Sequence, residues 1–260
     1  VLRRIVRGIA RHWARARGKG STRIRGVRYW TDPYHIGFWR DVERNRWEPG
    51  LFDVLEKHLG PTSVYVDVGA WIGPTVIFAA RKCRSVYCLE PDPDAYQYLL
   101  WNLRLNEIRN VTPFNVALAS ETGIRRIVSP AGGLGDSKSS LLPTPGAAGG
   151  VLVPCMRWTD WLAFTGAVRP DFIKMDIEGG EFEVIPSMAE YLHRERPTLY
   201  LSLHAALLDA KDRERNLDTL LDVLGQFTTR LGEDGKSVTV DQIRQTAMTR
   251  FCSFLFTSAR

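Results

Sequence analysis

Acidic side chains and one histidine stand at the ends of two apolar runs that are typical of buried strands. Residues 171–177 (DFIKMDI) carry Lys174 and Asp176 on one strand face and are followed by Glu178, whereas residues 198–204 (TLYLSLH) end in His204. Parallel strands end at the same edge of a sheet, so we expect these side chains to lie close together. A carboxylate or an imidazole there can orient a hydroxyl group and remove its proton. Asp176, Glu178 and His204 are therefore the candidate catalytic residues.

Two alternatives remain open for this group. Asp176, Glu178 and His204 could together hold a divalent cation, because carboxylate oxygen and imidazole nitrogen both ligate such ions, and the spacing does not decide between a base and a metal ligand. Glu178 or Glu181 could also cap the helix that follows the EGGE segment.

A second chemical signature is the segment 64–73 (VYVDVGAWIG), an apolar run that leads through an acidic residue into a glycine-punctuated turn. Gly69 permits a backbone conformation closed to other residues and a close approach to a ligand, and Gly73 lets the turn enter the next helix. Pro74 suits the first turn of that helix, whose free amide groups favour an anionic ligand group. The pattern predicts a nucleotide pocket, although a plain strand-turn-helix would share it.

Glu90 ends the next apolar run, 21 residues after Gly69. This is the approximate interval at which an acidic residue accepts hydrogen bonds from ribose hydroxyls. Asp92 either assists or caps the helix that begins near Asp94. Trp71 stands where a dinucleotide fingerprint has its central glycine, which argues against a nicotinamide cofactor.

From residue 64 the pattern alternates between strands and helices, which predicts a parallel sheet covered on both faces. We expect strands at 64–68, 85–90, 111–118, 124–129, 171–177 and 198–204, and helices at 74–81, 94–106, 181–193 and 205–224. Residues 229–257 suggest antiparallel strands at a sheet edge.

Residues 22–63 are expected to form a cap with one short strand at 22–30 and an interrupted helix at 37–59. Residues 130–150, rich in Gly, Pro, Ala and Ser, predict a flexible loop, which either covers the substrate side as a lid or is disordered.

Composition indicates one domain of ordinary polarity. The 260 residues carry a net charge of +6, yet the first 28 contain ten Lys and Arg and no acid. Residues 1–21 are therefore assigned as a basic amphipathic extension, whose residues 1–17 could contact a membrane surface peripherally or pack on the domain or a second subunit.

No apolar run is long enough to span a bilayer, and a signal peptide is not expected. The four cysteines lack the spacing of metal ligands or of a disulfide framework, which favours a cytoplasmic protein. Peripheral attachment to the inner face of the membrane is the alternative location.

Taken together, the segments DVGAWIG, LEPDP, LLWNLRLNEI, NVAL and DFIKMDIEGGEFEVI resemble those of FkbM-type methyltransferases over roughly residues 64–204. The resemblance implies an α/β, Rossmann-like class I methyltransferase fold with a mainly parallel seven-stranded sheet, helices on both faces and an N-terminal helical extension. It also implies S-adenosylmethionine as cofactor and O-methylation of a sugar hydroxyl or a secondary metabolite. The expected partner is a small-molecule or oligosaccharide acceptor rather than nucleic acid, and a homo-oligomer is allowed.

The resemblance also assigns cofactor-binding residues. Asp67, Gly69 and Gly73 would surround the methionine portion of the cofactor, Glu90 the ribose, and Asn115, Val116 and Ala117 the adenine edge. Ala70, Trp71, Pro91 and Asp176 complete the set. Trp71 departs from the family, which usually has Asn there.

Two other functions remain as alternatives to methyl transfer. A nicotinamide-dependent oxidoreductase is disfavoured by Trp71. A non-catalytic module of the same fold could use the basic helix to bind a membrane or nucleic acid. The domain assignment is then an extension at 1–21 and one methyltransferase domain at 22–260.

Overall fold

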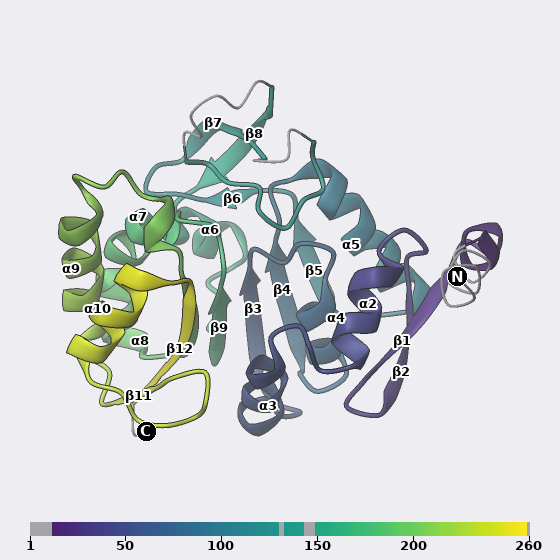
Figure 1. Ribbon diagram of the computed structural model, residues 1–260, viewed down its shortest axis with the longest axis horizontal. Helices are drawn as coiled ribbons and strands as arrows, with labels where there is room; N and C mark the ends of the chain where they lie inside the picture. Colours follow the sequence, from purple (N-terminus) through teal and green to yellow (C-terminus); the bar gives the residue numbers. More distant parts are fainter. Residues whose placement is uncertain (1–11, 130–132, 143–148, 259–260) are drawn as a thin grey trace.

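The computed structural model describes residues 12–129, 133–142 and 149–258, and its centre is a seven-stranded sheet (Figure 1). The strand order is β11-β12-β10-β9-β3-β4-β5. Strands β5, β4, β3, β9 and β10 are mutually parallel, β12 is antiparallel to β10, and β11 is antiparallel to β12. The expected seven-stranded, mainly parallel sheet with an antiparallel edge is confirmed. The strands are β3 (Val64–Val68), β4 (Ser85–Leu89), β5 (Val111–Phe114), β9 (Phe172–Met175), β10 (Thr198–Leu203), β11 (Thr229–Leu231) and β12 (Cys252–Thr257).

Alternating side chains of the sheet enter two apolar cores, one on each face. Val66 and Val68 of β3 belong to one core and Tyr65 to the other, so that all of β3 is buried. Helices cover both faces, as the β-α alternation predicts. The first core contains helices α6 (Trp158–Phe164), α7 (Glu181–Ser187), α8 (Ala189–Glu195), α9 (Arg213–Leu224) and α10 (Val240–Thr249), and the second contains α2 (Ile36–Glu43), α3 (Pro49–His58), α4 (Pro74–Ala80) and α5 (Pro93–Leu105).

The N-terminal cap is tied to helix α5 and to the turn after β3 by buried polar contacts. The expected short strand at 22–30 is instead a hairpin of β1 (Gly20–Ile24) and β2 (Val27–Thr31), because Arg25 and Gly26 both take positive φ and reverse the chain. Asn102 of α5 accepts a hydrogen bond from the amide of Asp32 (2.7 Å) and donates to the carbonyl of Ile72 (2.9 Å). One side chain therefore fixes the cap against the glycine turn that follows β3.

Of the basic extension, only residues 12–21 lie in the described part of the chain, and residues 12–16 are helical. The predicted apolar stripe of the extension falls mainly on residues 2–9, outside the described residues, so membrane contact through residues 1–17 stays a prediction. No helix in the described ranges combines the length and the hydropathy needed to cross a bilayer.

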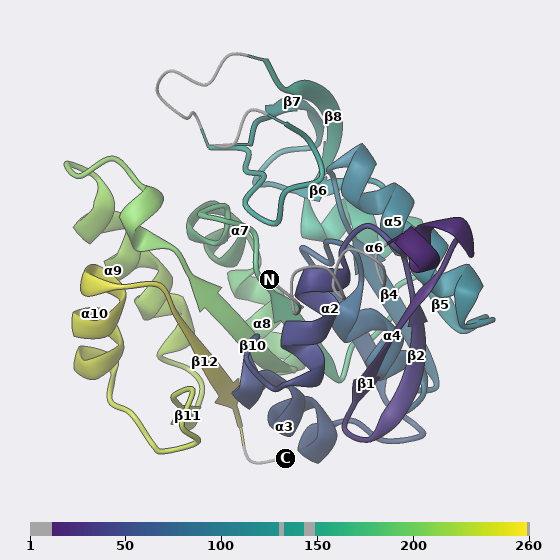
Figure 2. The same ribbon diagram turned by 45° about the vertical axis from the view of Figure 1, so that its right-hand side comes forward.

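A small three-stranded sheet lies beyond the central one, at the top of Figure 1. It contains β6 (Ala117–Leu118), β8 (Val151–Met156) and β7 (Gly123–Ile127) in that order. The run at 111–118, expected as one strand, is therefore divided between two sheets. Described residues 133–142 of the expected loop have little regular structure and lie near this sheet (Figure 2).

Two expected helices are interrupted. The helix expected at 181–193 breaks at Met188 between α7 and α8, close to Pro186, which lacks an amide donor and crowds the preceding turn. The helix expected at 205–224 begins only at Arg213. Its earlier part is a short 3-10 turn, η1 (Ala205–Leu207). The Arg213 guanidinium donates hydrogen bonds to the carbonyls of Ala206 and Leu208 in and after this turn. Helix α10 was not expected, although Thr239 and Gln242 form a capping box at its start.

Candidate active site

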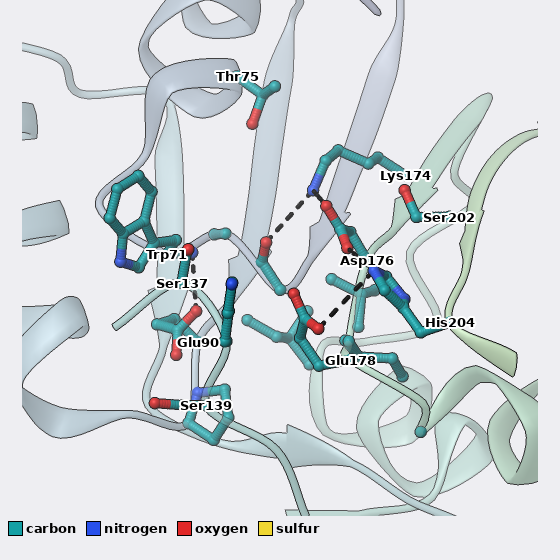
Figure 3. A pocket seen from close by; sticks show the side chains of 18 of the residues that line it. Trp71, Thr75, Glu90, Ser137, Ser139, Lys174, Asp176, Glu178, Ser202 and His204 are labelled. Carbon is teal, nitrogen blue, oxygen red and sulfur yellow. Dashed lines mark hydrogen bonds and ion pairs between the residues drawn. The ribbon is translucent and has the colours of Figure 1, made fainter. Parts of the chain in front are cut away.

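The carboxyl ends of β3, β4 and β9 meet at the edge of a cavity of about 310 Å³. The amides of Gly69 and Ala70 both donate to the Leu89 carbonyl, and the Asp176 amide donates to the Val68 carbonyl, so the three strand ends are tied together. Figure 3 shows Trp71 and Glu90 on one side of the cavity and Asp176, Glu178 and His204 on the other. We call these the turn side and the cluster side. Of the predicted site residues, Gly69, Ala70, Trp71, Glu90, Pro91, Val116, Ala117, Asp176, Glu178 and His204 line the cavity, whereas Asp67, Gly73 and Asn115 do not.

Gly69 is required by its conformation and by its closest neighbour. Its φ is +82°, and a Cβ atom there would lie 1.8 Å from the carbonyl oxygen of Asp176. No side chain fits this position, so the turn can approach β9 only with glycine. Gly73 also has a positive φ, and a Cβ there would lie 2.5 Å from Leu99, so its part is to pack the turn onto α5.

Asp67 lies behind the cavity, and both of its carboxylate oxygens accept hydrogen bonds. It accepts from Lys174 Nζ (3.2 Å) and Tyr65 Oη (3.0 Å), and also from the hydroxyl of Thr75. Lys174 in turn donates to the Gly69 carbonyl (3.3 Å) and lies 3.8 Å from Asp176. Burial alone would lower the pKa of Lys174, but Asp67, Asp176 and Glu48 raise it above its usual value. Asp67 therefore acts on the cavity through Lys174 and the turn.

Trp71 and Glu90 form the turn side. Glu90 accepts hydrogen bonds from the Trp71 amide (2.7 Å) and the Asp92 amide (2.8 Å), and burial raises its pKa to about 7. Trp71 takes a φ of +47°, its indole packs edge-on against Phe38, and its Nε1 donates to the Gly135 carbonyl (2.9 Å). The tryptophan therefore helps to hold residues 133–142 over the cavity.

The remaining predicted cofactor residues surround the end of β4. Val116 and Ala117 line the cavity beside Pro91. Asn115 lies behind them and donates to the carbonyls of Glu90 (2.8 Å) and Pro91 (3.1 Å), which fixes the position of Glu90.

Asp176, Glu178 and His204 are brought together on the cluster side. His204 Nε2 lies 3.6 Å from Asp176 Oδ1 and 3.8 Å from Glu178 Oε2. Behind the ring, buried Glu181 accepts from the His204 amide (2.6 Å) and from Nδ1 (3.2 Å), and its other oxygen accepts from the Gly179 amide (2.8 Å). Glu181 thus fixes the histidine as well as the turn before α7.

The charges of this cluster perturb one another. Burial raises the pKa of Glu178 to about 7, against the opposing effect of His204. Burial alone would lower the pKa of His204, but its hydrogen bond to Glu181 and the charges of Glu181, Asp176 and Glu178 raise it to about 9. The neighbouring carboxylates therefore favour the protonated form of the imidazole.

Glu48 was missed by the sequence reasoning. It lies in the N-terminal cap just before α3, takes a left-handed φ of +37° and lines the cavity. Its Oε2 atom is buried and makes no hydrogen bond within the described residues. Burial and the charge of Asp176 raise its pKa to about 8. No motif marks this residue, since it reaches the cavity only through the packing of the cap.

Asp92 has a larger part than the sequence suggested. It caps α5 by accepting from the amides of Asp94 and Ala95, and its second oxygen accepts from the Gly135 amide and the Ser139 hydroxyl, both at 2.7 Å. Ser140 donates to the Glu178 carbonyl (2.7 Å). Residues 133–142 are thus bound to both sides of the cavity.

A family model and several characterised proteins match this chain. The family model described as "Methyltransferase FkbM domain" matches residues 67–244. Hexuronic acid methyltransferase AglP of Haloferax volcanii is 26% identical over 175 residues, covering 67% of this chain and 69% of that protein. The 2-O-methyltransferase NoeI of Sinorhizobium fredii is 26% identical over 193 residues, covering 68% of this chain and 76% of that protein.

A shorter match is to tRNA (guanine(37)-N(1))-methyltransferase of Mus musculus, 34% identical over 80 residues. It covers 29% of this chain and only 16% of the length of that protein. The family model, in contrast, spans more than half of the chain and includes the Gly69 turn, Glu90, Asp176 and His204. The chain therefore belongs to the FkbM methyltransferase family.

Proposed function

We propose that this protein transfers the methyl group of S-adenosylmethionine to a hydroxyl group of a carbohydrate or a glycosylated metabolite. The observation that carries the proposal is the division of one cavity into a glycine-turn side and a side of carboxylates with a histidine. The cofactor supplies an electrophilic methyl group on a sulfonium, and the protein has to orient the acceptor oxygen and remove its proton.

The turn side suits the cofactor. Gly69 lines the cavity, and its lack of a side chain lets the turn pack directly against the carbonyl oxygen of Asp176. Glu90 is held by two amides at the end of β4, where each of its oxygens retains a second lone pair for a ribose hydroxyl. Val116, Ala117 and Pro91 offer an apolar edge for the adenine, and Asp67 with Lys174 supports the turn from behind.

The cluster side suits the acceptor. Asp176 lines the cavity next to Gly69 and is partly exposed, so it can orient an acceptor hydroxyl near the cofactor. Glu48 is the proposed proton acceptor, because its Oε2 is a buried carboxylate atom of a cavity-lining residue and has no hydrogen-bond partner in the described residues. His204 is the second candidate, because Glu181 already holds its Nδ1 and its Nε2 lies near the carboxylates of Asp176 and Glu178.

The carbohydrate assignment is supported by the similarity to AglP, a hexuronic acid methyltransferase, and to NoeI, a 2-O-methyltransferase. The cavity adds two aromatic residues, Trp47 and half-exposed Phe251, whose faces can pack against the apolar side of a sugar ring.

The test is a transfer assay with methyl-labelled S-adenosylmethionine and a panel of hexuronic acids, other sugars, glycosylated metabolites and tRNA. We expect label in a sugar hydroxyl. Labelling of tRNA alone would reject the carbohydrate assignment. Stabilisation of the protein by NAD but not by S-adenosylhomocysteine, in a thermal-shift comparison, would reject the cofactor.

A further inference from the structure

We propose that Asp176, Glu178 and His204 bind one divalent cation of the Mg²⁺ or Mn²⁺ class. One donor atom from each residue lies within 4.8 Å of the other two. For metal-oxygen distances of about 2.1 Å, octahedral geometry places neighbouring ligands about 3 Å apart and opposite ligands about 4.2 Å apart. The separations of 3.6 and 3.8 Å between His204 Nε2 and the two carboxylates lie within this range, so small side-chain movements would close the site.

The histidine is held as metal-ligating histidines are. Its side chain is only 8% exposed, and Glu181 fixes the ring by accepting from Nδ1 on the side away from the cluster. Nε2 therefore points toward Asp176 and Glu178, yet it lies too far from either for a hydrogen bond. A carboxylate behind a ligating histidine is the usual arrangement for setting its orientation, which makes Glu181 a positioning residue.

The local charge also favours a cation. Asp67, Asp176, Glu178 and Glu181 lie within this network, with Glu48 facing it. Their negative charges are partly offset by Lys174, by His204 and, at Glu178, by Lys138. The Glu178 carboxylate makes no hydrogen bond in the described ranges, and its ion-pair partner there is His204, at 3.8 Å. A divalent cation would neutralise the negative charge that remains on these carboxylates.

The donor set indicates the class of cation. Two carboxylates and one imidazole with open positions suit a hard cation that keeps bound waters, and Mn²⁺ accepts such a mixed oxygen and nitrogen set. All three residues line the cavity, so an acceptor hydroxyl could take one open position and have its pKa lowered there. That role rests on the proposed function, whereas cation binding itself does not.

The experiment titrates metal-free protein with Mn²⁺ and follows binding by calorimetry and electron paramagnetic resonance. We expect one site, with pulsed spectra that show coupling to an imidazole nitrogen. Asp176→Asn and Glu178→Gln should each weaken binding at least about tenfold, and His204→Gln should also remove the nitrogen coupling. Glu181→Gln should weaken binding about 10- to 100-fold while the coupling persists. The matched control is Glu190→Gln, whose side chain is 94% exposed and should leave binding unchanged.

S-adenosylhomocysteine stabilisation of each variant checks that it has folded. Absence of Mn²⁺ binding by folded wild-type protein at millimolar concentration would overturn the site. Nitrogen coupling that survives in folded His204→Gln would do the same. Mn²⁺ binding without methyl transfer to any acceptor would leave the cation site standing and reject the proposed function, so the two failures are distinguishable.

Discussion

The turn side and the cluster side of the cavity differ in how their polar groups are satisfied. On the turn side, Glu90 accepts two backbone amides, and behind it Asp67 accepts three side-chain donors. On the cluster side, His204 Nε2 stands 3.6 and 3.8 Å from its carboxylate neighbours, and one oxygen of Glu48 has no hydrogen-bond partner in the described residues.

The two sides therefore differ in whether their polar groups are already hydrogen-bonded before a ligand binds. Fully hydrogen-bonded groups hold their geometry before a ligand arrives, which reduces the ordering that binding has to supply. Buried polar groups without partners are costly in the free protein and become satisfied when a ligand or an ion supplies the missing contact. We therefore expect substitutions on the turn side to change affinity and stability, and substitutions on the cluster side to change turnover.

The most damaging substitution should be Gly69→Ala, because Gly69 of the turn side packs directly against Asp176 of the cluster side. The new Cβ would lie 1.8 Å from the Asp176 carbonyl oxygen at a φ of +82°. We expect S-adenosylhomocysteine affinity to fall by at least about 100-fold in calorimetry, with a lower melting temperature. Gly123→Ala is the control, since a Cβ at Gly123 meets no atom within 4 Å and no positive φ is required. Near-normal affinity in Gly69→Ala would contradict the described turn.

Glu48→Gln should separate turnover from affinity. The amide keeps the shape but cannot accept a proton, so we expect kcat to fall by about 10² to 10⁴, while the Kd for S-adenosylhomocysteine changes little. The rising limb of the wild-type pH profile should be lost with it. Glu43→Gln, on the exposed end of α2, is the control. An unchanged kcat would remove Glu48 from the mechanism.

A third prediction concerns pH and the stability of the ligand-free turn side. Burial raises the pKa of Glu90 from 4.5 to about 7, so the folded state holds this proton more tightly than the unfolded chain. The resulting stabilisation is fully present below about pH 4.5 and is lost as the pH rises through about 7. We expect the melting temperature of wild type to fall relative to that of Glu90→Gln over this window, by several degrees. If melting temperature changed with pH in parallel for the two proteins, burial would not destabilise the Glu90 carboxylate.

The smallest effect should come from Trp71→Phe. Phenylalanine keeps an aromatic ring against Phe38 but loses the indole donor to the Gly135 carbonyl, which is worth about 1 kcal/mol. We expect at most a several-fold loss of S-adenosylhomocysteine affinity and faster proteolysis within residues 133–142. A loss beyond about 100-fold would show that the indole contacts the ligand directly.

The same division explains what could be predicted from the sequence. The turn side comes from consecutive elements, so the glycine turn, the acidic residue 21 positions later and the parallel sheet could be read as local patterns. Asp176 and His204 could be paired because both end parallel strands. Glu48 could not be found, because it reaches the cavity through the packing of the cap against the sheet. The hydrogen bonding of Asp67 also depends on Lys174, which lies 107 residues away in the chain.

The central claim is that the turn side binds the cofactor while the cluster side acts on the acceptor. The most direct test measures the S-adenosylhomocysteine Kd and the kcat of Glu90→Ala and Asp176→Asn in parallel, once an acceptor is known. We predict that Glu90→Ala raises Kd at least about tenfold, and that Asp176→Asn lowers kcat at least about 100-fold with Kd within a few-fold of wild type. The account would be contradicted if Asp176→Asn weakened S-adenosylhomocysteine binding as much as Glu90→Ala and left kcat unchanged.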